Sequence, residues 1–328
     1  MKMGLVGVMW ISWLLLASVA LAFDLQGHRG ARGLAPENTL PAFSRALSVG
    51  VTTLELDTCI TRDGVVVISH EVALSPDITR DNTGKWLSGR GPVIHSLTFA
   101  ELQQYDVGRI KPGTNYARQH PEQQPADGAR IPRLADLFAL VKKSGNEQVR
   151  FNIETKISPL ARDEAPEPED FAKMLVEVIR QAGMTTRVAI QSFDWRTLQV
   201  VQRITPEIPT VYLSVQQRFL DTMLADKSGG SPWTAGVQYK DHGSVAKMIK
   251  AAGGKIWSPY FGDVTEGKLK EAHDLGLSVI VWTVNEPAQI TRMLESEVDG
   301  IITDRPDIAR ELMAKRGMAL PQPTPVTP

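Results

Sequence analysis

Three acidic side chains occupy alternate positions in two short β-rich stretches, TLELDTCI and QVRFNIETKI. Alternate residues of a strand share a face, so Glu55 and Asp57 point the same way, opposite to their leucine neighbours. Glu154 ends the second stretch in the same manner. Three carboxylates from neighbouring strand ends form a ligand set for a hard divalent cation, calcium or magnesium. The alternative is an exposed strand edge that carries Glu55 and Asp57 without a function.

A basic side chain follows the third carboxylate. Lys156 lies two residues beyond Glu154, on the same face of the expected strand. Its ammonium group could contact a phosphate oxygen, or it could simply neutralise Glu154 in a salt bridge. Zinc is a poor fit to this cluster, because no group of cysteines and histidines has zinc-ligand spacing.

Two of the six histidines stand where strand-like stretches end. His28 is the last residue of the strand-like stretch 25–28, and His70 is the last residue of GVVVISH. A lone histidine at such a place is more often structural, but two that flank a carboxylate cluster favour an acid–base pair near neutral pH. The other four are expected at the surface: His95, His120, His242 and His273.

The elements that position these residues alternate between strand-like and helix-like stretches, which predicts a parallel sheet. Eight strands over about three hundred residues fit a (β/α)8 TIM barrel, in which chemistry collects at the carboxyl ends of the strands. A doubly wound open sheet is the alternative, but no Gly-x-Gly-x-x-Gly follows the first strand. The predicted strands are 25–28, 53–57, 148–154, 187–191, 210–213, 255–258, 278–283 and 300–303, and the predicted helices are 39–49, 170–182, 195–204, 245–252, 266–275 and 288–295.

The two ends of the chain are expected to lie outside the barrel, which spans 23–315. Residues 1–22 have the pattern of a secretory signal peptide, because an uncharged stretch ends in the small-residue sequence Ala20-Leu21-Ala22. An uncleaved membrane anchor is the alternative. With cleavage, we expect an exported protein, periplasmic or secreted, without stable membrane insertion. The Pro-rich residues 316–328 are expected to form a flexible tail.

The regular alternation fails between about Glu71 and Ile131, after the second strand. An insertion of this length in a compact domain is typical of a lid, a cap or a binding loop. The formal net charge of −1 argues against a basic surface for nucleic acid. A single cysteine, Cys59, excludes an internal disulfide.

Several motifs of the chain are similar to those of the glycerophosphodiester phosphodiesterases: GHRGARGLAPENTLPAFSRAL, LELDTCITRDGVVVISHE, FNIETK, VWTVNEP and VDGIITDRPD. The resemblance covers nearly the whole chain after residue 22, and it implies a TIM barrel. It also implies site residues with distinct roles. These are His28 and His70 as the acid–base pair, Arg29 and Lys156 at the phosphate, Glu55, Asp57 and Glu154 as ligands of calcium or magnesium, and Glu37, Asn38 and Trp282 in support.

The same resemblance implies metal-dependent hydrolysis of glycerophosphodiesters, the deacylated phospholipids, to an alcohol and sn-glycerol 3-phosphate. One alternative is a phospholipase-type phosphodiesterase on the same barrel that acts on intact lipids. The polar insertion disfavours this alternative, because such an enzyme calls for an apolar loop facing the membrane. The other alternative is a binding protein that has lost catalysis, which the intact set of histidines, acids and cations disfavours. For Trp282, the alternative to a pocket wall is an ordinary packed tryptophan.

Overall fold

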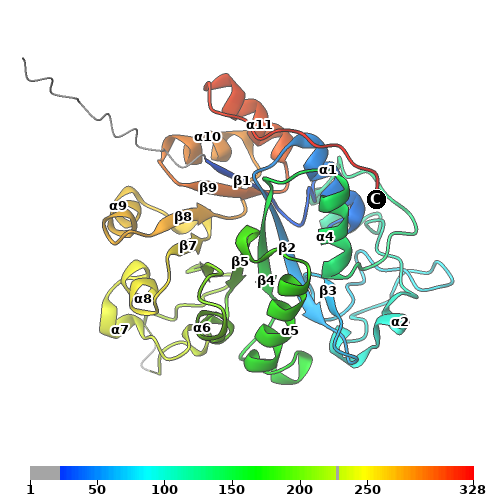
Figure 1. The fold of residues 1–328 in the computed structure, drawn as a ribbon, viewed down its shortest axis with the longest axis horizontal. Coiled ribbons are helices and arrows are strands. Elements are labelled where there is room, and N and C mark those ends of the chain that lie inside the picture. Colours follow the sequence, from blue (N-terminus) through cyan, green and yellow to red (C-terminus); the bar gives the residue numbers. More distant parts are fainter. Residues whose placement is uncertain (1–22, 227–228) are drawn as a thin grey trace, which may run out of the picture.

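A computed structural model of the chain describes residues 23–226 and 229–328. Within these residues, eight parallel strands close into a barrel that helices surround, as the TIM-barrel prediction expects (Figure 1). The first strand pairs with both the second and the last, and these two pairings close the ring. The strands are β1 (Asp24–Gly27), β2 (Thr53–Ile60), β3 (Val66–Ile68), β4 (Arg150–Thr155), β5 (Val188–Ser192), β6 (Thr210–Ser214), β7 (Ile256–Pro259), β8 (Ser278–Val281) and β9 (Gly300–Thr303), of which β3 is an antiparallel addition to β2.

The two faces of β2 and β4 carry different chemistry. Leu54, Leu56 and Ile153 are fully buried on the outer face, where helices cover the barrel. Phe151 packs edge-on against Phe138 of the neighbouring helix, with ring centroids 4.9 Å apart. The apolar residues therefore hold the barrel to its helices, and the polar residues between them face the barrel interior.

The helices follow the strands in sequence and lie outside them. Two helices that the sequence pattern did not predict, α4 (Leu134–Lys143) and α11 (Pro306–Lys315), complete the outer layer. α11 begins at Pro306, directly after the last strand, where proline suits the first helical turn. The larger helices are α1 (Leu40–Val49), α4 (Leu134–Lys143), α5 (Pro168–Gln181), α6 (Trp195–Ile204), α8 (Val245–Ala251), α9 (Glu266–Asp274), α10 (Pro287–Glu295) and α11 (Pro306–Lys315), with a short α7 (Tyr239–His242) before α8.

The segment predicted as an insertion runs from β3 to α4 and contains two short helices, α2 (Phe99–Leu102) and α3 (Asn115–Gln119). It has a small apolar core of its own, which packs against Cys59 of β2 and Val67 of β3. Because this core is separate from that of the barrel, the segment forms a compact flap beside the strand ends. The core consists of Cys59, Val67, Leu74, Ile94, Leu102, Val107 and Ile131.

The C-terminal segment differs from the flexible tail that its prolines predict. It forms no helix or strand beyond residue 317, but it runs past α1 and α4 (Figure 1). The Thr324 N–H donates to the Leu47 carbonyl at 2.9 Å, and Lys143 donates to the Thr327 carbonyl at 2.8 Å. Val326 packs against the main core. The extended backbone of the tail thus binds the helices through its own peptide groups.

Two further expectations meet the structure differently. His120 was expected at the surface, which is wrong: its side chain is buried and packs edge-on against Tyr116 at 4.7 Å. The predicted signal peptide, residues 1–22, lies outside the described residues. In the part of the chain that the structure describes, no helix is both long and apolar enough to cross a membrane.

Candidate active site

Three carboxylates meet inside the barrel at the carboxyl ends of β2 and β4. The register of these strands places Asp57 beside Glu154, and Glu55 lies one pleat below. One oxygen from each of the three side chains lies within 4.8 Å of the others, and all three residues are buried. Burial excludes the exposed-edge alternative for Glu55 and Asp57.

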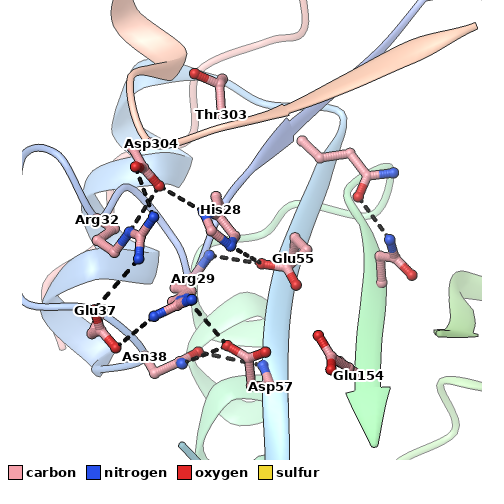
Figure 2. Close-up of polar contacts among 12 residues, drawn as sticks. His28, Arg29, Arg32, Glu37, Asn38, Glu55, Asp57, Glu154, Thr303 and Asp304 are labelled. Carbon is pink, nitrogen blue, oxygen red and sulfur yellow. Dashed lines mark hydrogen bonds and ion pairs between the residues drawn. The ribbon is translucent and has the colours of Figure 1, made fainter. Parts of the chain in front are cut away.

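His28 follows the last residue of β1 and points toward this carboxylate cluster (Figure 2). Its Nε2 atom lies 3.9 Å from Glu55 Oε2, and its Nδ1 atom lies 2.6 Å from Asp304 Oδ1. Asp304 follows β9, the strand that pairs with β1. The closure of the barrel therefore brings the histidine and the aspartate together.

The surroundings of Asp304 decide which nitrogen of His28 carries the proton. Burial opposes ionisation, but Arg32 and His28 together hold the pKa of Asp304 well below its usual range. An ionised carboxylate can only accept hydrogen bonds, so His28 Nδ1 donates and Nε2 keeps its lone pair. Burial, with help from the charge of Arg32, lowers the pKa of His28 to about 4 against the opposing effect of Asp304. At neutral pH Nε2 is thus ready to accept a proton.

His70 lies after β3, and its Nδ1 atom also contacts a carboxylate, as that of His28 does. Its Nδ1 atom is 2.7 Å from Glu71 Oε1, and the hydrogen bond to His70 outweighs burial and lowers the pKa of Glu71 to about 2. Nδ1 therefore donates, and Nε2 is again the unprotonated nitrogen. Burial and the nearby cations Arg29 and Lys156 lower the pKa of His70. The side chain of His70 is 27 % exposed, against 11 % for His28, so His70 is the more accessible of the two.

A strained turn after β1 positions the guanidinium of Arg29. Arg29 has a φ of 50°, and Gly30 has a φ of 87°. A Cβ at Gly30 would lie 2.6 Å from the Ala42 carbonyl carbon, so only glycine fits between the turn and α1. Left-handed backbone at a non-glycine residue costs free energy and is concentrated at functional sites. Here it directs the Arg29 N–H to Glu55 Oε2, at 2.9 Å.

The Pro-Glu-Asn-Thr turn braces both Arg29 and the carboxylates (Figure 2). Glu37 Oε1 accepts from Arg29 Nη1 at 2.9 Å, and Asn38 Nδ2 donates to Asp57 Oδ2 at 2.9 Å. Asn38 is itself in the left-handed region, with a φ of 55°. The turn thus holds the Arg29 guanidinium through Glu37 and holds the Asp57 carboxylate through Asn38.

Lys156 reaches two of the three carboxylates. Its Nζ donates to Glu154 Oε1 at 2.9 Å and lies 3.7 Å from Asp57 Oδ1. These carboxylates outweigh burial and raise the pKa of Lys156, so it remains charged. The salt bridge between Lys156 and Glu154 is therefore present. The ammonium group also lies beside Asp57, at the carboxylate cluster.

The three carboxylates carry more negative charge than the described residues neutralise. Burial and the charge of Asp57 raise the pKa of Glu55 well above its usual value. Burial also raises the pKa of Glu154 to about 7, whereas His70, Lys156 and Arg29 outweigh burial and lower that of Asp57. A divalent cation among the three carboxyl groups would offset their mutual repulsion, because its charge would allow all three to ionise.

Several buried polar atoms at the site form no hydrogen bond with any described residue. They are Arg29 Nε, Glu37 Oε2 and Asp57 Oδ1. Arg29 Nε lies 3.4 Å from Asp57 Oδ2, and Lys156 Nζ lies 3.7 Å from Asp57 Oδ1, so these atoms have ion-pair partners but no hydrogen bond. Buried polar groups are normally hydrogen-bonded, so a donor and a carboxylate oxygen without hydrogen bonds indicate a place for a ligand. The donor suits an anion, and the oxygen suits a cation.

Trp282, predicted to support the site, packs among other aromatic side chains at the end of the barrel where the strands end. It follows β8, and its Nε1 donates to the Ser258 carbonyl at 2.9 Å. Its ring contacts Tyr260 and Phe193 at the same end of the barrel. No hydrogen bond links it to the acidic cluster among the described residues.

The structure adds four polar residues that the sequence reasoning missed. Arg32 donates twice to Asp304, each time at 2.9 Å, and Asn285 donates to the same carboxylate at 2.7 Å. Gln191 donates to Glu55 Oε1 at 2.7 Å. Asp304 and Gln191 lie at the carboxyl ends of β9 and β5, so the strand-end rule that selected His28 could have found them. These groups orient His28 and Glu55.

Comparison with known proteins gives a consistent picture. A family model described as the glycerophosphoryl diester phosphodiesterase family matches residues 28–308. The chain is 27% identical over 290 residues to the glycerophosphodiester phosphodiesterase of Caldanaerobacter subterraneus, with 88% of this chain and 97% of the relative covered. The crystal structure of a candidate glycerophosphoryl diester phosphodiesterase from Silicibacter pomeroyi is similar over 92% of this chain and 96% of that one, with 35% identity and a TM-score of 0.81. A phosphodiesterase of Oleispira antarctica, solved in complex with the product sn-glycerol-3-phosphate, shares the fold at 20% identity, with a TM-score of 0.63 over 89% and 96% of the two chains.

Proposed function

The chain belongs to the glycerophosphoryl diester phosphodiesterase family, and we propose that it hydrolyses glycerophosphodiesters to an alcohol and sn-glycerol 3-phosphate. We propose further that the reaction depends on a divalent cation and uses His28 and His70 as its acid–base pair. The product bound to the Oleispira antarctica phosphodiesterase supports the choice of product.

One observation carries this proposal. Two histidines, each with Nδ1 held by a carboxylate, lie beside three buried carboxylates and two cations at one end of the barrel. The Nε of Arg29, which makes no hydrogen bond with the described residues, and the ammonium of Lys156 offer donors to a phosphodiester. A binding protein without catalysis would have no need for two histidines whose unprotonated nitrogens are held ready.

The chain's own residues supply binding and proton transfer. Arg29 and Lys156 offset the charge of the phosphodiester and the charge that develops in the transition state. One histidine accepts the proton of the attacking hydroxyl, from water or glycerol, at Nε2. The other gives a proton to the departing alcohol, after the bound anion has raised its pKa.

A metal ion fits the carboxylate cluster. Glu55, Asp57 and Glu154 would hold it, because all three are buried oxygen donors and Asp57 Oδ1 accepts no hydrogen bond from the described residues. Oxygen ligands favour calcium or magnesium. Such an ion would supply Lewis-acid stabilisation to a phosphoryl oxygen.

The test uses the purified chain from Phe23 onward with glycerophosphocholine. We expect release of sn-glycerol 3-phosphate that EDTA abolishes and that calcium or magnesium restores. His28→Ala and His70→Ala should each abolish turnover while the circular dichroism spectrum is retained. The surface variant His273→Ala should behave as the wild type. Turnover that persists in excess chelator would overturn the metal assignment, and an active His28 or His70 variant would overturn the paired-histidine mechanism.

We also propose that residues 1–22 direct export and are removed. N-terminal sequencing of protein from a periplasmic or culture-medium fraction should then begin at Phe23. A chain that keeps Met1 in the membrane fraction would instead indicate an uncleaved anchor.

A further inference from the structure

Three buried amide side chains form a hydrogen-bonded row across the barrel interior, which we call the amide network: Gln26 of β1, Asn152 of β4 and Gln191 of β5. Asn152 Nδ2 donates to Gln26 Oε1 and to Gln191 Oε1, each at 2.9 Å. No more than 2 % of any of these residues is exposed. The network meets a carboxylate at each end, because Gln191 donates to Glu55 at 2.7 Å and Gln26 donates to Asp24 at 2.9 Å.

The two carboxylates decide the direction of every hydrogen bond in the amide network. Glu55 Oε1 and Asp24 Oδ2 accept, so each glutamine turns its NH2 group outward and its carbonyl oxygen toward Asn152. Asn152 therefore faces two acceptors and donates both of its side-chain hydrogens. A side chain with one hydrogen or none cannot take its place.

Asn152 leaves its own oxygen unsatisfied in this arrangement. Its Oδ1 makes no hydrogen bond with any described residue, although the residue is almost fully buried. A buried acceptor without a hydrogen bond destabilises a fold, whereas an apolar side chain does not. Val211 and Ile302, the register partners of Gln191 and Gln26, show that the same interior accepts apolar side chains. Packing alone therefore gives no reason for an amide at position 152.

Glu55 is held by hydrogen bonds at both of its carboxylate oxygens. Gln191 donates to Oε1, and the Arg29 N–H donates to Oε2 at 2.9 Å (Figure 2). The Arg29 donor belongs to the backbone of the turn after β1, whereas the Gln191 donor is on a side chain with rotatable bonds. The hydrogen bond from Asn152 fixes the carbonyl end of that side-chain amide. The orientation of Glu55 thus depends on Asn152 through Gln191.

We infer that Asn152 is a positioning residue for the metal site, because it holds the Gln191 amide that orients Glu55. The inference rests on the proposed function, in which the three buried carboxylates hold a divalent cation. It extends that site to a side chain that donates to none of the three ligands. Groups that orient a metal ligand commonly change metal affinity by about 10- to 100-fold.

The experiment is a double-mutant cycle on metal affinity, measured by calorimetric titration of the purified chain from Phe23 onward with calcium or magnesium. We expect Asn152→Leu, which has a similar branched shape and no donor, to weaken metal binding about tenfold. The double variant Asn152→Leu/Gln191→Leu should bind metal as weakly as Gln191→Leu alone, because Asn152 acts only through Gln191.

Two further variants separate positioning from packing. Asn152→Thr keeps a hydroxyl in the strand but has one hydrogen for two acceptors, so it should also weaken metal binding. It provides the test if Asn152→Leu does not fold. Ile280→Val removes a buried methylene from β8 and should lower the stability to denaturant, but it should bind metal as the wild type does.

The outcomes separate this inference from the proposed function. An Asn152 variant that is less stable to denaturant but binds metal as the wild type does would overturn the inference alone, since the amide would then only hold strands together. A double variant that binds metal more weakly than Gln191→Leu would also overturn it, because Asn152 would act by another route. Wild-type protein that binds neither ion would overturn the metal assignment of the proposed function, and the inference with it.

Discussion

The Nδ1 atom of His28 lies 2.6 Å from Oδ1 of Asp304, which is 276 residues further along the chain. Arg32 and Asn285 hold the same carboxylate from its other sides. This relationship fixes the tautomer of His28 and directs Nε2 toward the carboxylate cluster. Asp304 is therefore a positioning residue for the reaction.

Replacing Asp304 by asparagine should lower kcat by about a hundredfold or more, with a smaller effect on KM, because the imidazole loses its tautomer and orientation. Asp304 raises the pKa of His28 against burial. Its loss should therefore shift the acidic limb of the pH–rate profile to lower pH. The control is Asp299→Asn, because Asp299 contacts His273 in an exposed pair. A slower enzyme with an unmoved acidic limb would indicate a purely structural role.

Lys156→Met separates the two roles of this lysine. If Lys156 contacts the phosphate, the variant should bind sn-glycerol 3-phosphate about tenfold more weakly at saturating metal, because a charge-assisted hydrogen bond is lost. Product inhibition measures this affinity. If the lysine only neutralises Glu154, product affinity should stay constant and metal affinity should rise. Lys142→Met, at an exposed lysine that donates to the Ala182 carbonyl, is the matched control.

Gln191→Leu should weaken metal binding about 10- to 100-fold, because the amide that orients Glu55 is removed. Titration of the purified protein with calcium or magnesium, followed by calorimetry, gives the affinity without reference to turnover. Gln199→Leu changes an exposed glutamine on the adjoining helix and should bind metal as the wild type does. Equal affinities in the two variants would show that Glu55 does not depend on Gln191.

Glu154 should make the metal-free protein less stable as the pH rises. Burial raises its pKa to about 7 in the folded state, above its ordinary value of 4.5, so the folded state holds a proton that the unfolded state has lost. The stabilisation is present below pH 4.5 and disappears as the pH rises through 7, a change of about 3 kcal/mol.

Denaturant unfolding in EDTA at pH 5 and pH 8 measures this effect. The free energy of unfolding of wild type should fall more between these two pH values than that of Glu154→Gln, which cannot ionise at this position. Comparing the two proteins removes the contribution of His28, whose lowered pKa acts in the opposite direction. Identical pH dependence in the two proteins would contradict a raised pKa at Glu154.

The strand ends made much of the site predictable from the sequence. Glu55, Asp57 and Glu154 were recognised because the period of two separates inward from outward side chains in any strand. That rule depends on local sequence alone. It fixed the barrel class as well, because eight such strands alternate with helices.

The partners of these residues were less predictable, because they depend on which strands become neighbours. Asp304 meets His28 only through the pairing of β9 with β1, and Gln191 reaches Glu55 across the barrel interior. Local patterns carry no information on such long-range contacts. The left-handed backbone at Arg29 and Asn38 was equally hidden, since neither residue type requires it.

The closure of the barrel has a consequence for how activity arises during folding. The first strand cannot complete its hydrogen bonding until the last strand is present, and Asp304 comes after that last strand. Contacts so far apart in sequence form late, because the intervening chain must first give up its freedom. Partly folded or truncated chains that lack the final strand would keep the three carboxylates but not the held histidine. The hydrolysis rate that returns during refolding would then measure the fraction of chains with a complete barrel. Compact chains without the last strand would not contribute to it.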